Sequence, residues 1–363
     1  MAHLKRFLVA LLAIGLLSYC VKRPLYNWDM IGYVASAHVR NGLSGAQLSE
    51  RTYADVKESV PKDVFVELIT GPYRSAVYAD PKSLEQQVPF YSIRVVYVEL
   101  IRALGSWGVS PVRASHVLSA IFAALSVFPV AGILARSGVT CLALPVVVGA
   151  SGLLELGRLS TPDALATFCA LTSVHLLLVG RMKAAGLIFT CLPLLRTDFV
   201  ILSLALASYC WSRGERRLAA TSVLLSLCLY FVVVQASGGY GWQTVFNFTF
   251  IQASPYPADM QPSFEWRSYF NIYTTFDQAI FQHAHWTLYA LALIPAFGDL
   301  LKNRMTKQDL LMYWVPVFFV FVHLLLFPAY MQRFFVFSAA IVCCWLFGRL
   351  VAPPHAPSEA RAG

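Results

Sequence analysis

The sequence predicts an all-α integral membrane protein, a polytopic bundle of about ten transmembrane helices. Hydrophobic residues make up 58% of the 363 residues, and charged residues make up only 13%. Several apolar runs approach the roughly 20 residues that a helix needs to cross a bilayer. The net charge is +9, but the basic residues stand in short clusters between these runs, as in cytoplasmic loops. This pattern argues against nucleic acid as a partner.

The first predicted span follows Lys5 and Arg6 and ends at Val21. It resembles a signal peptide, but no small-x-small cleavage site ends the run, so we interpret it as a retained membrane helix. Later spans are expected at about 115–135, 139–157, 163–179, 184–196, 198–211, 218–236, 284–300, 310–329 and 333–350. The stretch 184–211 fits either one long tilted helix or two spans joined by a tight turn.

The segment 88–104 is apolar enough to suggest a further span, but it carries Arg94, Glu99 and Arg102. These charges and Ser92 share one face of a helix, and apolar residues cover the other face. The pattern predicts one amphipathic helix that lies in the membrane interface and does not cross it. The distribution of Lys and Arg agrees, because a crossing here would put the later basic clusters outside.

This topology places both termini in the cytoplasm and leaves two long exoplasmic loops with short helices, at about 22–114 and 237–283. Residues 1–351 are then a single transmembrane domain, and the proline-rich residues 352–363 are expected to form a disordered cytoplasmic tail. All eight cysteines lie in hydrophobic runs without a CxxC spacing. Neither a disulfide framework nor a thiolate metal site is expected.

Ionisable side chains near the predicted span ends need a partner or a function, since inserting one at the bilayer centre costs about 2.5–3.5 kcal/mol. On the predicted topology, they gather on the exoplasmic side: Asp29, Glu155, Arg158, Asp163, Arg196, Asp198 and Arg333. An outward-facing cavity lined by carboxylates and guanidiniums would result.

Five of these side chains also have a purely structural interpretation. Asp29 and Asp163 fit helix caps. Arg196 and Asp198 fit an ion pair that staples a tight turn, and Arg333 fits a side chain that snorkels to the interface. The sequence leaves the two interpretations open.

Five short segments together resemble the GT-C superfamily of integral membrane glycosyltransferases, which includes protein O-mannosyltransferases and lipid A aminoarabinose transferases. Residues 29–35, Asp-Met-Ile-Gly-Tyr-Val-Ala, are similar to that family's first-loop acid and the helix after it. Residues 88–119 resemble its interfacial helix, a glycine-containing turn and the start of span two. Residues 160–165 resemble a second acidic turn, 194–198 a basic turn after span five, and 332–335 a late Arg-aromatic motif.

The resemblance implies an enzyme that moves a sugar from a polyprenyl-phosphate-linked donor to a hydroxyl of a glycan, lipid or protein acceptor. The expected location is a bacterial plasma or inner membrane, with the active site on the exoplasmic side. Asp29 would be the general base for the attacking hydroxyl, and direct displacement would invert the anomeric carbon. Asp163 would bind sugar or acceptor hydroxyls.

The resemblance also assigns the substrate-binding side chains. Arg196 and Arg333 would bind the phosphate, because a guanidinium offers paired donors to phosphate oxygens. Trp28 and Tyr33 would stack on sugar or prenyl groups. The first loop has a single Trp-Asp where metal-dependent relatives carry an Asp-x-Asp motif. We therefore assign no metal ligands, although a divalent cation at Asp163 is compatible with the pattern.

Three rival functions remain from the sequence. A transporter or flippase for a lipid-linked or anionic substrate would use the same charges, but it predicts paired halves and broken helices near the membrane midplane. A polysaccharide polymerase would take a lipid diphosphate oligosaccharide as its donor. A non-catalytic scaffold with the same topology would tolerate the loss of Asp29.

Overall fold

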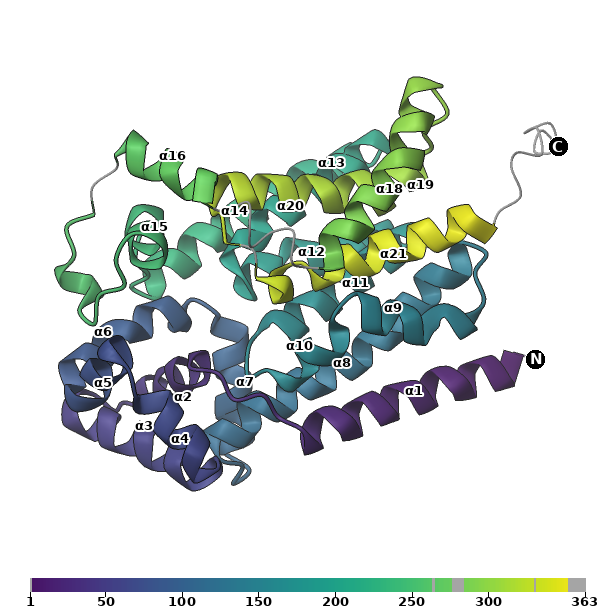
Figure 1. Cartoon of the computed structure of the whole chain (residues 1–363). Helices are drawn as coiled ribbons and strands as arrows, with labels where there is room; N and C mark the ends of the chain where they lie inside the picture. The colour runs from purple at the N-terminus through teal and green to yellow at the C-terminus, as the bar shows by residue number, and fades with distance from the viewer. Residues whose placement is uncertain (1, 263–264, 276–283, 330, 352–363) are drawn as a thin grey trace.

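The computed structural model consists of helices and their connections (Figure 1). It describes residues 2–262, 265–275, 284–329 and 331–351. No β-strand occurs in these ranges, so the predicted all-α fold is confirmed. The predicted cytoplasmic tail lies outside the described residues.

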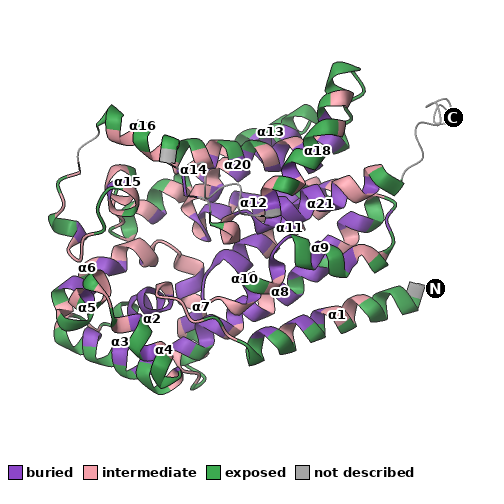
Figure 2. Ribbon diagram, in the orientation of Figure 1, coloured by how far each residue is buried: buried purple, intermediate pink, exposed green. Residues whose placement is uncertain are grey.

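Four helical segments are long and apolar enough to cross a membrane. They are α1 (Ala2–Lys22), α8 (Pro111–Arg136), α14 (Arg216–Ala236) and the continuous stretch Lys307–Leu326, which ends in α20 (Val315–Leu326). At 1.5 Å per residue, α8 is about 39 Å long, which exceeds the roughly 30 Å hydrocarbon core. Large apolar side chains are exposed along α1, α14 and α20, and exposed residues line α1 in Figure 2. Such surfaces suit contact with lipid.

Shorter helices complete the bundle. They are α9 (Leu144–Ala150), α10 (Leu153–Arg158), α11 (Asp163–Leu178), α12 (Met182–Thr190), α13 (Val200–Ser212), α18 (Ala284–Leu301) and α21 (Val336–Val351). The predicted span 139–157 is divided between α9 and α10, because Gly152 between them has a left-handed backbone with φ of 77°. The stretch 184–211 is two helices, α12 and α13, separated by short 3-10 turns at 192–194 and 197–199. The total of ten spans stays a prediction.

Small residues let the bundle helices approach closely. A Cβ atom added to Gly157 on α10 would lie 2.7 Å from the Cβ of Ala123 on α8 and 2.8 Å from the Sγ of Cys20 on α1. These three helices therefore meet with almost no side chain between them, as is common in membrane bundles. The main buried core extends from this junction through α11, α13 and α21.

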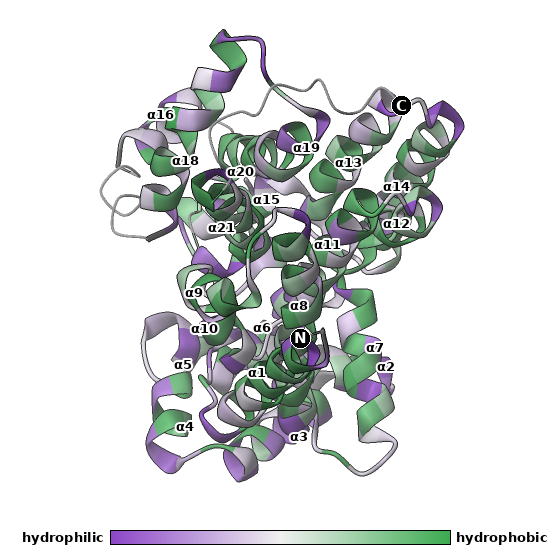
Figure 3. Cartoon of the chain, turned by 90° about the vertical axis from the view of Figure 1, so that its right-hand side faces the viewer, coloured by the Kyte–Doolittle hydropathy of each residue, from purple (hydrophilic) through white to green (hydrophobic). Residues whose placement is uncertain are grey.

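Six helices lie between α1 and α8 in the chain. They are α2 (Asp29–Arg40), α3 (Gly45–Ser59), α4 (Lys62–Ile69), α5 (Pro72–Ala79), α6 (Pro81–Ser92) and α7 (Val95–Gly105). Helices α2 to α6 form a smaller cluster with its own core, and α7 packs with α2 and α8 in a separate one. Figure 3 shows more hydrophilic residues on α3 and α4 than on α8 or α20. Inside this cluster, His38 Nε2 lies 2.9 Å from Asp55 Oδ2. Burial lowers the pKa of His38, and the hydrogen bond with Asp55 opposes that shift.

The prediction of one helix over 88–104 is wrong, because α6 ends at Ser92 and α7 begins at Val95. Arg94 stands at the break with a non-helical backbone (φ −92°, ψ 58°). Two hydrogen bonds hold this junction against a distant segment. Ser92 Oγ donates to the Ser237 carbonyl at 3.1 Å, and Ser237 Oγ donates to the Ser92 carbonyl at 3.3 Å. Amphipathic periodicity carries no information about such tertiary bonds.

The two segments predicted as exoplasmic loops lie at the same end of the bundle. Helices α2 to α6 and helices α15 (Trp242–Phe250) and α16 (Trp266–Thr275) occupy the left of Figure 1. They also touch, since Ser83 Oγ donates to the Pro255 carbonyl at 2.6 Å. The beginning of α1 and the end of α21 lie at the opposite end (Figure 1). Which end faces the cytoplasm stays a prediction.

Candidate functional site

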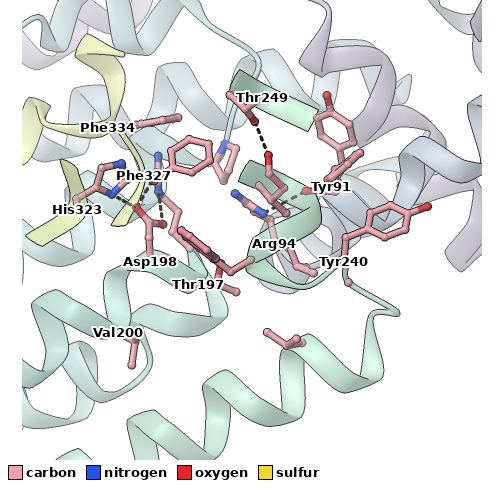
Figure 4. A pocket seen from close by; sticks show the side chains of 18 of the residues that line it. Tyr91, Arg94, Thr197, Asp198, Val200, Tyr240, Thr249, His323, Phe327 and Phe334 are labelled. Atoms are coloured by element: carbon pink, nitrogen blue, oxygen red, sulfur yellow. Dashed lines mark hydrogen bonds and ion pairs between the residues drawn. The ribbon is translucent and has the colours of Figure 1, made fainter. Parts of the chain in front are cut away.

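A cavity of about 400 Å³ lies between the two loop segments and the bundle (Figure 4). One part of its wall is charged, with Asp29, Arg94, Asp163, Arg196, Asp198, His323 and Arg333. Another part is apolar, with Ile93, Val200, Ile201, Val234, Val245, Phe248, Leu326 and Phe327. The cavity can therefore accept a molecule that has both a polar and an apolar portion.

Four of the predicted site residues meet at this cavity although they are far apart in the sequence. Asp29 is the first residue of α2, and Asp163 is the first residue of α11. Arg196 lies between the two 3-10 turns that separate α12 from α13, and Arg333 lies in the 3-10 turn before α21. Tyr33, the fifth, also lines the cavity.

Trp28 is not among the lining residues. Its ring packs 5.3 Å from that of Tyr73 and 6.2 Å from that of Tyr91, so it supports the cavity wall from behind. Arg158 also lies elsewhere, where its Nε donates to the Arg23 carbonyl at 2.7 Å. The predicted gathering of charges thus holds for part of the set only.

The cavity charges form a continuous series of ion pairs. Asp29 Oδ2 lies 2.5 Å from Arg333 Nη1, and Arg333 Nε lies 3.6 Å from Asp163 Oδ2. Asp163 in turn accepts a hydrogen bond from Arg196 Nη1. Arg196 binds the Asp198 carboxylate in a bidentate manner, since Nε donates to Oδ1 at 3.1 Å and Nη2 donates to Oδ2 at 2.9 Å. We call these five residues the ion-pair series.

A histidine and an aromatic ring extend the ion-pair series at its Arg196 end. His323 Nδ1 lies 3.2 Å from Asp198 Oδ2. The Arg196 guanidinium stands over the Phe334 ring, 4.1 Å from its centroid, in a favourable cation–π position. The Arg196 side chain is only 4% exposed, so all of its charge is compensated inside the protein. The predicted Arg196–Asp198 ion pair is confirmed, and it lines the cavity as well.

The side chain of Asp29 makes no helix-capping bond. Oδ2 accepts from Arg333 and from Asn27 Nδ2 (3.3 Å), and Oδ1 accepts from Tyr91 Oη (3.3 Å). Gly32 makes room for this arrangement, since a Cβ there would overlap the Tyr91 ring. The capping interpretation of Asp29 is therefore not what the geometry shows.

The environment keeps the groups around Asp29 in their usual protonation states. Burial and the nearby Asp29 carboxylate raise the pKa of Tyr91 well above its ordinary value, so its hydroxyl stays a donor. Burial disfavours the charge of Arg333, but Asp29 and Asp163 outweigh it and raise the pKa of that guanidinium. The ion-pair series holds three carboxylates against two guanidiniums.

Two basic residues that line the cavity, Arg94 and His323, were not predicted as site residues. His323 interrupts the apolar run Val-Phe-Phe-Val-Phe-Val-His-Leu-Leu-Leu, and an isolated ionisable residue in such a run is itself a functional signal. Arg94 was assigned to the polar face of an interfacial helix. The break between α6 and α7 brings the Arg94 side chain to the cavity. The sequence pattern does not indicate this break.

The described residues contain no group of three or more His, Cys, Asp or Glu side chains placed to hold a metal ion. The Asp29 and Asp163 carboxylates are bound by arginines. Comparisons of this chain with protein-family models, curated proteins and solved structures found no match.

Proposed function

We propose that this chain is an integral membrane glycosyltransferase that moves a sugar from a polyprenyl-phosphate-linked donor to an acceptor hydroxyl. The observation that carries the proposal is the placement of Asp29. Its carboxylate lines a cavity that also offers guanidiniums and an apolar wall. A lipid-linked sugar phosphate has the matching parts, namely a prenyl chain, an anionic group and a hydroxyl-rich sugar.

The reaction needs a base on one side of the sugar and positive charge on the other. Asp29 accepts the proton of the acceptor hydroxyl while that oxygen forms a bond to the anomeric carbon. The bond between the anomeric carbon and the phosphate oxygen breaks, and the phosphate leaves with the electron pair. A single displacement inverts the configuration of the anomeric carbon.

The remaining members of the ion-pair series keep Asp29 in place. Arg333 joins Asp29 to Asp163, and Asp163 is itself held by Arg196. Preorganised charges of this kind lower the barrier because they need not reorient during the reaction. In this scheme, Asp163 binds sugar or acceptor hydroxyls with the face that Arg196 leaves free, and Tyr33 borders the sugar.

The test is transfer by purified protein, with a panel of radiolabelled polyprenyl-phosphate sugars. Asp29→Asn is expected to lower the rate by about 10²–10⁴-fold, the usual contribution of a general base, while donor binding persists. Asp63→Asn, a change of an exposed carboxylate on α4, is the matched control and should act like wild type. An Asp29→Asn enzyme as active as wild type would refute the assignment of the base.

One observation favours a second candidate, a transporter of a lipid-linked or anionic substrate. An apolar segment is interrupted at the cavity, between α12 and α13, where Arg196, Thr197 and Asp198 line its wall, and broken helices are a feature of transporter sites. Reconstitution in liposomes separates the two functions. A transporter moves the labelled donor across the bilayer without consuming it, whereas a transferase or polymerase cleaves it.

A further inference from the structure

We propose that Arg94, and neither Arg196 nor Arg333, is the side chain that binds the phosphate of the ligand in the cavity. This inference rests on the proposed function for the identity of the ligand as a lipid-linked phosphate. It rests on geometry alone for the assignment of the phosphate group to Arg94.

Carboxylates already balance the charges of the two guanidiniums in the ion-pair series. Arg196 directs Nε and Nη2 to Asp198 and Nη1 to Asp163. Arg333 directs Nη1 to Asp29, while its buried Nε makes no hydrogen bond in the described residues and lies 3.6 Å from Asp163. The charge of Arg333 is therefore balanced by two carboxylates, which distinguishes it from Arg94. A phosphate that bound Arg196 would have to displace a carboxylate, and the three carboxylates of the series would repel a phosphate at either guanidinium.

Arg94 differs in that no carboxylate pairs with it among the described residues. Its one hydrogen bond runs from Nη1 to the Phe90 carbonyl at 3.1 Å. Its Nε is buried and has no acceptor in the described part of the chain. Buried donors are nearly always satisfied in folded proteins, so an unsatisfied guanidinium nitrogen in a cavity wall points to an anionic ligand.

The structure also fixes where Arg94 stands. The α6–α7 junction is held by the two Ser92–Ser237 hydrogen bonds, and a Cβ on Gly239 would lie 2.8 Å from Ile93 Cγ2. Helix α7 begins at the next residue without a side-chain cap, so its positive end adds to the charge of Arg94. In Figure 4, Arg94 is drawn between the Asp198–His323 pair and the Tyr91 and Tyr240 rings.

This position divides the cavity into an anionic and a cationic side that one substrate can bridge. Tyr33, Arg94 and Asp29 all line this one cavity. A phosphate on Arg94 and a base at Asp29 therefore face the same space. The attacking hydroxyl and the leaving phosphate would then lie on different sides of the sugar, as direct displacement requires.

The test measures binding of three probes to the full-length protein in detergent: farnesyl phosphate, inorganic phosphate and farnesol. Arg94→Gln is expected to weaken farnesyl phosphate binding by about tenfold to hundredfold, the loss typical of one hydrogen bond to a charged group. Arg94→Lys should retain most of the affinity, and farnesol should bind both proteins equally. Arg113→Gln, a change of an exposed arginine outside the cavity, is the matched control.

The outcomes separate this inference from the proposed function. Equal affinity of wild type and Arg94→Gln for farnesyl phosphate overturns the inference, even if sugar transfer is observed. Farnesyl phosphate binding that depends on Arg94, with no sugar transfer from any donor, supports the inference and contradicts the proposed glycosyltransferase function. Inorganic phosphate that binds as tightly as farnesyl phosphate supports Arg94 as the anion ligand and identifies free phosphate as the source.

Discussion

The most direct test of the ion-pair series is Arg196→Met. Methionine keeps most of the length and the apolar stem of arginine, so the contacts with Phe334 and Phe199 change little. The charge is lost, and the Asp163 carboxylate, whose side chain is 5% exposed, keeps only Arg333 Nε at 3.6 Å. A buried charge without a close partner is strongly destabilising.

The magnitude follows from the burial of both partners. Removing one member of a buried pair costs about 3–5 kcal/mol. An unfolding entropy of about 2.1 cal/mol/K per residue means that each kcal/mol shifts the Tm of a domain of about 350 residues by about 1–2 °C. Arg196→Met should therefore lower the Tm of the purified protein by about 3–10 °C, measured by thermal unfolding in detergent. Arg181→Met, at an exposed arginine without an ion pair in the described residues, should leave Tm within about 1 °C, a shift worth roughly 0.5–1 kcal/mol.

A second variant distinguishes charge compensation from lost packing. Adding Asp163→Asn to Arg196→Met removes the uncompensated carboxylate and should recover about 0.5–3 kcal/mol, the usual size of such couplings. If the double variant melts at or below the temperature of the single variant, or if Arg196→Met melts like wild type, the ion-pair series does not stabilise the site as described.

Three further predictions concern the surroundings of the site. Gly32→Ala should displace the ring of Tyr91, whose hydroxyl donates to Asp29. The rate of sugar transfer should fall by about tenfold or more, since a small misplacement of a catalytic group lowers the rate by up to about 10²-fold. A turnover rate equal to that of wild type would contradict this. Burial lowers the pKa of His38, so the unfolded chain binds a proton at this histidine at a higher pH than the folded protein does. Stability should therefore fall as the pH drops below about 6.5. A plot of Tm against pH should show a smaller fall for His38→Gln than for wild type. Gly157→Ala should cost about 1–3 kcal/mol by overpacking, whereas Gly149→Ala, with nothing within 4 Å of its added Cβ, should melt like wild type.

The sequence was sufficient to predict the helical membrane class and the meeting of Asp29, Asp163, Arg196 and Arg333. Both predictions depend on physical terms that are local in sequence. Apolar runs report the cost of placing polar groups in lipid, and charges near the ends of such runs stand out for the same reason. These charged residues lie in turns or at helix starts. Turns at the same end of a helical bundle lie near one another, which brings the four side chains to one cavity.

What the sequence could not predict depends on tertiary contacts. Trp28 was assigned to the substrate by the resemblance to a glycosyltransferase family, but its ring packs behind Tyr91. Arg94 was assigned to a helix surface because periodicity treats 88–104 as continuous. The break there depends on hydrogen bonds to Ser237, which lies 145 residues from Ser92. No local pattern encodes a bond between segments so far apart.

The two oxygens of Asp29 have different partners, and this difference constrains any mechanism that uses Asp29 as a base. Oδ2 is held by Arg333 at 2.5 Å and by Asn27, so a proton placed there would disrupt an ion pair. Among the described residues, Oδ1 accepts only from the Tyr91 hydroxyl, at 3.3 Å, which is a long and weak bond. An acceptor hydroxyl would therefore approach Oδ1, on the side of the carboxylate where Tyr91 lies. A phosphate held at Arg94 would have to leave on the opposite side of the sugar, so the orientation of the donor between Asp29 Oδ1 and Arg94 decides whether direct displacement can occur.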